Sequence, residues 1–428
     1  MKGKLVEKLL RTRFPVFYGY WILLVGFICQ VIMNGCASYA FSLYVTPLDT
    51  EFGWNRATIM VGYMMFQLML GFSSTFMGRV IFRFGAKLII AAGALLMGIG
   101  FVLLSLTQAL WQFYLFYAIV GVGSAAAGGV PTSMIVSDWF KKRRGFAIGI
   151  LGTGIGVGGF VMPILLGTYV MPNFGWRMGY VVSGIISAGI LIPFSLWLIK
   201  PKPADMDFLP DQRELLRDNS DQTSNVPESS FKLNIVLKTK AFWLMVISFT
   251  VFGIANSQTF QNTVPHLQDV GFSAVFAAST LSIVGIGSAI GKFGFGWLCD
   301  FIPPKYVLVI GSALQASGTL ILMSISSNSP AFLLWLFAII FGLGVGSWFP
   351  AVSLTTSATF GLTAFGDVFG IYYMLFMISS AIGPWLGGFI FDITRSYSMA
   401  FLLCLIFYAI AVPCMMLMRR PKLKRVAH

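Results

Sequence analysis

The chain has 428 residues, of which 57% are apolar and only 10% are charged. A soluble globular domain carries about a quarter charged residues, so this composition excludes an ordinary soluble protein and predicts an all-α polytopic membrane protein. The net charge of +14 would favour nucleic acid as a partner of a soluble protein. Here we expect no nucleic-acid role, because the charge follows the pattern of membrane topology.

Twelve apolar runs have the length needed to cross a bilayer, which takes about 20 residues of helix. A basic segment precedes the first run, as in a signal peptide. This run is too long for one and lacks a small-x-small cleavage site, so we expect a retained first helix. An even number of spans places both termini on one side. The runs lie near 20–46, 57–78, 87–106, 112–137, 146–170, 178–198, 242–263, 274–298, 306–325, 331–358, 368–391 and 399–418.

The distribution of Lys and Arg predicts the orientation. With both termini in the cytoplasm, the outer segments hold only Arg56, Arg177 and Arg395 of the 29 basic residues. This asymmetry is the positive-inside rule, and it predicts a multi-pass protein of the cell membrane, inner or plasma. The basic runs at the inner ends are interpreted as topology determinants that contact anionic lipids.

The chain divides into two halves around one long polar stretch, which is rich in Pro, Asp and Glu and reads as a cytoplasmic linker. We therefore predict five segments: a tail at 1–16, a six-helix bundle at 17–200, the linker at 201–240, a second six-helix bundle at 241–418, and a tail at 419–428.

The two halves repeat one another. Gly53 precedes Gly78 by 25 residues, and Gly271 precedes Gly296 by the same interval. Residues 123–131 likewise match 342–350, each running from Gly to Pro. Internal duplication predicts two pseudo-symmetric six-helix bundles with a substrate site between them near the midplane.

Lys292 is the only charged side chain well inside any apolar run. About 12 Å of helix separates it from Asp300 at the end of that run. Ser288, Gly285 and Leu281 lie on its helical face, which is small and partly polar as a cavity lining would be. We favour a fixed counter-charge for a small anion, because an ammonium inside the bilayer is costly. The alternative is a lysine that extends to the inner headgroups.

Other polar residues inside the runs are candidates for lining the same cavity. Each is equally well explained by hydrogen bonds to a neighbouring helix. They are Asn34, Tyr39, Asn256, Gln258, Tyr372 and Tyr373. The runs hold no nucleophile with a base, no paired carboxylates and no spacing of metal ligands, so we expect neither an enzyme nor a cofactor or metal.

Residues 78–87, Gly-Arg-Val-Ile-Phe-Arg-Phe-Gly-Ala-Lys, resemble the signature loop of the major facilitator superfamily, except that Phe82 stands where an Asp is usual. The copy at 296–300 keeps the acid as Asp300. This resemblance implies twelve transmembrane helices and a gate in which the acid pairs with basic residues of neighbouring loops. The candidate gating residues are Asp300, Arg83, Lys87, Arg143 and Arg144.

A narrower resemblance begins at Trp139. Residues 139–154, Trp-Phe-Lys-Lys-Arg-Arg-Gly-Phe-Ala-Ile-Gly-Ile-Leu-Gly-Thr-Gly, are similar to the fifth-helix signature of the monocarboxylate transporters and their bacterial relatives, including the oxalate/formate exchangers. Residues 38–41, Ser-Tyr-Ala-Phe, and the segment 266–273 match the same branch.

That resemblance implies roles for particular positions. Lys292 falls where these carriers have the eighth-helix arginine that pairs with the substrate carboxylate, and Ser288 where the animal members have an aspartate. Leu43 takes the place of a lysine in the first helix. Phe376 takes the place of the second lysine with which the exchangers bind a dicarboxylate. A single cation in the cavity favours a monoanion.

The expected function is therefore secondary active transport of a small monocarboxylate of the lactate, pyruvate, acetate or formate type by alternating access. The partners would be this organic anion, with or without a proton in symport, or a second anion in exchange, and we expect the monomer to function. One alternative is an exporter of amphipathic organic compounds. From a different class, the other is a nutrient sensor derived from a transporter.

Overall fold

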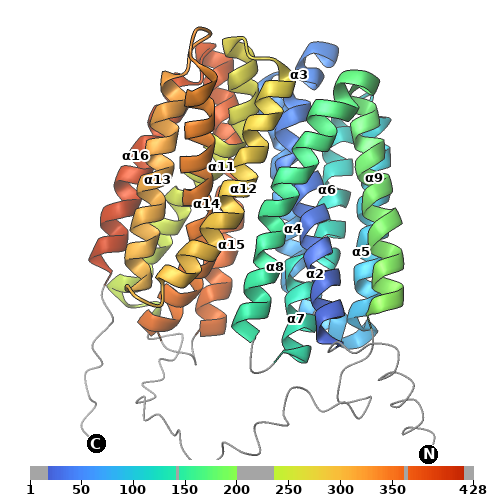
Figure 1. Cartoon of the computed structure of the whole chain (residues 1–428), viewed down its shortest axis with the longest axis vertical. Coiled ribbons are helices and arrows are strands. Elements are labelled where there is room, and N and C mark those ends of the chain that lie inside the picture. The colour runs from blue at the N-terminus through green and yellow to red at the C-terminus, as the bar shows by residue number, and fades with distance from the viewer. Residues whose placement is uncertain (1–17, 141–143, 200–235, 361–364, 419–428) are drawn as a thin grey trace, which may run out of the picture.

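The computed structural model describes residues 18–140, 144–199, 236–360 and 365–418, and every regular element in these ranges is a helix (Figure 1). The helices run along the long axis of the molecule and form two groups. The first group contains α2 (Gly19–Met33), η1 (Asn34–Tyr39), α3 (Phe41–Phe52), α4 (Arg56–Phe84), α5 (Ala86–Ser105), α6 (Leu110–Ala127), α7 (Gly129–Trp139), α8 (Arg144–Pro163), η2 (Ile164–Val170) and α9 (Met171–Leu198). The second contains α11 (Lys240–Val270), α12 (Ala274–Leu298), α13 (Pro304–Ser324), α14 (Ala331–Phe360), α15 (Phe365–Thr394) and α16 (Ser398–Leu417).

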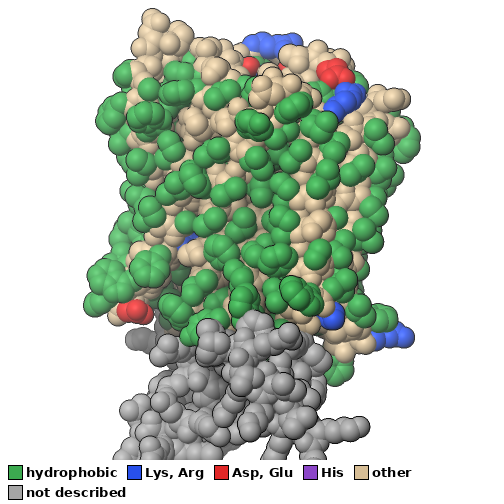
Figure 2. Space-filling view, turned by 45° about the vertical axis from the view of Figure 1, so that its right-hand side comes forward, with side chains coloured by type: hydrophobic (Ala, Val, Ile, Leu, Met, Phe, Trp, Pro, Cys, Tyr) green, Lys and Arg blue, Asp and Glu red, His purple; other side chains and the backbone are tan. Residues whose placement is uncertain are grey.

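The outer surface of the helices is apolar, as a membrane requires. Large apolar side chains such as Trp197, Phe293 and Phe72 stand mostly exposed around the bundle. Figure 2 shows a green and tan mid-section with most of the described charged side chains near its two ends. Helices that are apolar on all sides are buried in a core or in lipid, and here lipid is the only medium that can cover them.

Eleven described helices are long and apolar enough to cross a membrane, one fewer than the number of predicted spans. The difference arises at 146–198, which counts as one helix of 53 residues. At about 1.5 Å per residue it would extend roughly 80 Å, far beyond a hydrocarbon core of ~30 Å. Gly175 interrupts it with φ 80° and ψ 168°. Figure 1 accordingly shows α8 and α9 as separate rods.

The sequence repeat has a structural counterpart at the helix ends. Gly53 follows α3 with φ 65°, and Gly271 follows α11 with φ 111°. Both glycines adopt the left-handed conformation that ends a helix and that residues with a side chain rarely tolerate. The chain therefore ends a helix in the same left-handed conformation at corresponding positions of the two halves.

The two groups pack against each other along two pairs of helices, α8 with α12 and α4 with α15. Glycine permits the first contact. A Cβ at Gly285 of α12 would collide with the backbone of Gly159 and Phe160 of α8, and one at Gly156 would stand 2.6 Å from the Cβ of Ala289. Small residues at such a crossing allow the helix backbones to approach closely.

The first span departs from a regular α-helix in its middle. Residues 34–39 form the π-helix η1, between α2 and α3. A Cβ at Gly35 would meet the carbonyl of Gly158, so α8 passes very close to this segment. A π-helical turn inserts one residue and rotates the rest of the helix about its axis, which makes it a frequent feature of functional sites.

Substitution of Gly285 tests this packing. We expect Gly285→Ala to lower the melting temperature of the purified protein, because the new methyl group has only backbone atoms to displace. Gly294→Ala on the same helix is the matched control. It has no neighbour within 4 Å of the new Cβ, so it should be neutral or stabilising by up to about 1 kcal/mol. Equal melting temperatures for the two variants would contradict the close approach of α8 and α12.

Candidate site between the two helix groups

Lys292 lies half-buried on α12, in the second-last turn before that helix ends at Leu298. Its Nζ donates a hydrogen bond to Ser288 Oγ at 2.7 Å, one helical turn earlier. Ser288 is fully buried. Among the described residues Lys292 forms no ion pair. The ammonium thus has one neutral acceptor and retains two N–H groups for another.

Tyr39 brings the first helix group to the same place. It is the last residue of η1 and packs edge-on against Phe260 of α11, with ring centroids 4.7 Å apart. Its hydroxyl lies beside that of Ser288. Lys292, Ser288 and Tyr39 therefore form one polar row that crosses the interface between the groups.

A second polar contact crosses the interface at Gln261 of α11, a fully buried residue. Its Nε2 donates to the carbonyl oxygen of Ser38 in η1 at 2.9 Å, while its Oε1 has no partner among the described residues. Tyr63 of α4 has its hydroxyl beside the same amide. Sequence analysis did not select Gln261. The signal available in the sequence was the polar run at 256–263, which follows a mostly apolar first half of the helix.

Aromatic rings form another wall within the second group. The Phe376 ring stacks on Trp348 at 4.6 Å, and Trp348 stacks on Phe252 at 4.5 Å. Phe376, Trp348 and both tyrosines Tyr372 and Tyr373 line one cavity. The wall is mostly apolar, and its polar groups are the two tyrosine hydroxyls and the Trp348 indole N–H.

Several predicted site residues bond to their own helix group instead. Asn256 Nδ2 donates to Gln315 Oε1 at 2.7 Å, which also accepts from the Tyr408 hydroxyl at 3.0 Å. Asn34 Nδ2 donates to the Gln30 carbonyl at 3.1 Å. The Tyr372 hydroxyl donates to the Phe242 carbonyl at 3.5 Å, whereas Tyr373 remains 40% exposed. Hydrogen bonds of this kind join helices to one another, which was the alternative to a role in lining the cavity.

Leu43 lines a different space. It belongs to a cavity of about 340 Å³ on the side of the molecule where α3, α9, α11 and α12 meet, together with Pro47, Trp176 and Gln268. Its methyl groups contact Gly167 of η2. Leu43 and Phe376 thus line two different cavities.

The predicted gating residues are not joined to one another where the structure describes them. Asp300 is exposed just after α12, and in the described chain it forms no ion pair. Arg83 and Lys87 are also exposed, and the Arg83 guanidinium lies over the Phe84 ring, 5.3 Å from its centroid. Arg143 and the side chain of Arg144 lie outside the described residues, as does any pairing through them.

Comparison with known proteins agrees with this architecture. The model of the Major Facilitator Superfamily matches residues 23–293 and 264–427. The uncharacterized MFS-type transporter YcxA of Bacillus subtilis is 25% identical over 92% of this chain and 93% of its own length. Monocarboxylate transporter 12 of Mus musculus is 24% identical, over 95% of this chain and 87% of that protein.

Solved structures share the fold at lower identity. A bacterial homolog of the human lysosomal transporter Spinster superimposes with a TM-score of 0.71 at 16% identity, covering 94% of this chain and 97% of that one. The nucleoside transporter NupG gives a TM-score of 0.72 at 13% identity, covering 94% and 99%. At these identities the similarity establishes the arrangement of helices alone.

Proposed function

The chain belongs to the major facilitator superfamily, and we propose that it is a secondary active transporter of a small monocarboxylate, which binds between the two helix groups. The observation that carries this proposal is Lys292, an ammonium in a transmembrane helix whose only described hydrogen-bond partner is a neutral hydroxyl. A charge in this setting is costly unless an anion accompanies it. The similarity to monocarboxylate transporter 12 supports the same class of substrate.

The position of Lys292 also supports alternating access. The row of Lys292, Ser288 and Tyr39 takes residues from both groups, so a bound carboxylate would contact both. Movement of one group relative to the other then changes the side from which this anion can leave. We propose that the Asp300 end of the helices faces the cytoplasm, as the distribution of basic residues predicts.

We propose that the wall of Trp348 and Phe376 adds an apolar surface to the site. One cationic group and one aromatic wall suit a molecule with one carboxylate and an apolar remainder. The same wall favours the second candidate, export of amphipathic organic compounds. Accumulation of labelled acids in cells that express the protein supports import, whereas their faster loss from preloaded cells supports export.

Replacement of Lys292 is the direct test of the site. We expect Lys292→Gln to reduce monocarboxylate uptake to background, because the neutral amide cannot compensate the carboxylate. Lys292→Arg keeps the charge and should retain measurable uptake. Uptake by the glutamine variant at the level of the parent, with equal amounts of folded protein in the membrane, would refute the assignment.

Two buried serines of α12 provide a matched control. Ser288 accepts the hydrogen bond from Lys292, whereas the Ser282 hydroxyl donates to the carbonyl of Ala278 in its own helix. Ser288→Ala should therefore weaken uptake, and Ser282→Ala should leave it close to that of the parent. The opposite order would place the site elsewhere on the helix.

The charged side chains near the site also suggest how transport is driven. Among the described side chains, the carboxylates that contact Arg56 at the interface between the groups are those of Asp49, Asp269 and Asp392, and all three lie near the ends of their helices. We therefore propose either proton symport, with Lys292 changing its charge, or exchange of one monoanion for another. Uptake into proteoliposomes that requires internal substrate indicates exchange, and uptake driven by an imposed pH gradient indicates symport. A strict sodium requirement would contradict both.

The number of cationic side chains in the proposed site predicts the charge of the substrate. A second carboxylate would remain unpaired in a site with one ammonium, at a cost of several kcal/mol. Lactate and acetate should thus compete for uptake, and oxalate and succinate should compete poorly. Phe376→Lys adds a cation on the aromatic wall and should shift the preference towards the dicarboxylate. Oxalate that outcompetes lactate on the parent protein would overturn this prediction.

A further inference from the structure

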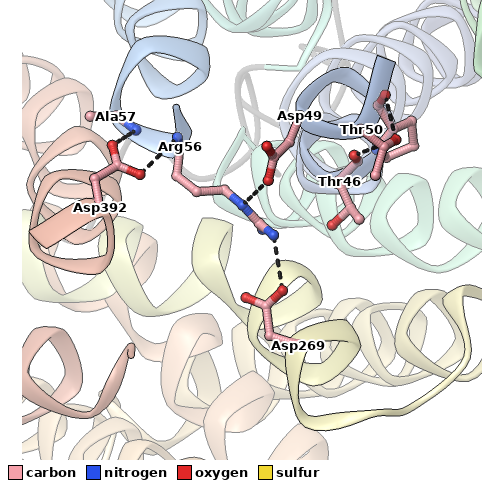
Figure 3. Close-up of polar contacts among 8 residues, drawn as sticks. Thr46, Asp49, Thr50, Arg56, Ala57, Asp269 and Asp392 are labelled. Carbon is pink, nitrogen blue, oxygen red and sulfur yellow. Dashed lines mark hydrogen bonds and ion pairs between the residues drawn. The ribbon is translucent and has the colours of Figure 1, made fainter. Parts of the chain in front are cut away.

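Charged residues from both helix groups meet at the opposite end from Asp300, around Arg56 (Figure 3). The Arg56 side chain is only 5% exposed. Its Nε donates to Asp49 Oδ2 at 2.9 Å, within the first group. Its Nη2 donates to Asp269 Oδ1 at 2.9 Å, at the end of α11 in the second group. The guanidinium therefore bonds both groups at once.

The start of α4 holds a carboxylate of the other group. Asp392, near the end of α15, accepts from the backbone N–H of Arg56 at 3.0 Å and from that of Ala57 at 2.9 Å (Figure 3). Asn55 precedes the helix but makes no capping bond with its side chain. A helix N-terminus with free N–H groups favours a carboxylate. Here that carboxylate moves away whenever the two groups separate at this end.

Two buried polar groups beside this cluster do not bind its carboxylates. Arg56 Nη1 and the Tyr397 hydroxyl are almost fully buried, and neither forms a hydrogen bond with Asp49, Asp269 or Asp392. Their polar ends lie next to each other, and the Arg56 guanidinium also lies 5.1 Å from the centroid of the Phe391 ring. The cluster therefore has hydrogen-bonding capacity that its own carboxylates do not use.

We propose that the N-terminus of α4 and the Arg56 guanidinium form a second carboxylate-binding site, distinct from Lys292. In the present conformation the protein's own Asp392 and Asp269 occupy it. When the groups separate at this end, the carboxylate of an external monoanion takes their place and is held at the entrance to the central cavity. The role in capturing substrate rests on the transport function proposed above.

The chemistry of the site explains why an anion would bind there. Separation leaves two backbone N–H groups and one guanidinium arm without acceptors, on a surface that has just opened. A carboxylate satisfies them with charge-assisted hydrogen bonds of the kind now made by Asp392 and Asp269. The alternative, that the cluster is only a latch between the groups, requires no external ligand.

A cysteine at position 57 tests the site directly. The backbone of Ala57 would contact any Cβ at Gly388 of α15, so its accessibility reports separation at this end. We would measure the rate of maleimide labelling of purified Ala57→Cys protein that also carries Lys292→Gln, with the same protein lacking the new cysteine as background. Because the central counter-charge is absent, the outcome does not depend on the Lys292 assignment.

Addition of Asp392→Ala empties the helix N-terminus and should speed labelling several-fold. Acetate should then slow it several-fold, while acetamide, which has the same size and no charge, should not. Arg56→Gln should abolish the protection. Arg177→Gln should preserve it, because Arg177 pairs with Glu51 within the first group at 2.7 Å.

Three results would overturn the proposal: labelling that does not respond to Asp392→Ala, equal labelling in acetate and acetamide, and protection that persists in Arg56→Gln. The second of these would leave the cluster as a latch only. If the Asp392→Ala protein does not fold, as judged by its melting transition, Asp392→Leu carries the same test, since the leucine side chain has nearly the shape of aspartate and no acceptor atom.

Discussion

One energetically unfavourable charge, that of Lys292, is central to this structure. Lys292 places an ammonium in a transmembrane helix beside neutral groups only, as far as the described chain extends. The helix that carries this charge is tightly packed on two sides: a Cβ at Gly285 would collide with the backbone of α8 in the first group, and one at Gly291 with that of α14 in the second. Close packing fixes the helix that carries the charge. It also brings Tyr39 of the other group to Ser288. An anion bound there would be held by both groups.

Polar contacts between the groups differ along the length of the molecule. In the middle they are neutral: Tyr39 beside Ser288, and Gln261 on the Ser38 carbonyl. At the Arg56 end they are ionic or charge-assisted. Neutral hydrogen bonds are individually weak and exchange partners readily, whereas buried charges need a replacement partner when they separate. Among the described contacts, this difference supports the proposed link between a change of conformation and an anion at the Arg56 end.

Sequence patterns predicted much of the fold because the membrane imposes simple rules. The apolar runs became helices, and the spacing of Gly53 and Gly271 marked equivalent helix ends in the two halves. Twelve spans were predicted and eleven long apolar helices are described, because 146–198 is one long helical stretch that turns at Gly175. The π-helical turn at 34–39 was not predicted, since it depends on the approach of α8 to Gly35.

The site was only partly accessible from the sequence. Lys292 and Ser288 were predicted together because they are one turn apart on one helix. The partners of Arg56 in the second group, Asp269 and Asp392, are 213 and 336 residues away in the chain, and no local pattern relates them to it. Asn256 has the polarity expected of a cavity residue, but it bonds to Gln315 within its own group. Polarity inside a span identifies candidates, and only the packing of the helices shows which of them meet.

The central claim is that Lys292 binds the carboxylate of a small monoanion, and ligand-induced stabilisation of the purified protein tests it most directly. A ligand that binds the folded state raises the melting temperature by mass action. The account predicts that lactate or acetate raises the melting temperature of the parent protein, that lactamide or acetamide does not, and that most of the shift disappears in Lys292→Gln. A shift of equal size in the parent and in Lys292→Gln would contradict it.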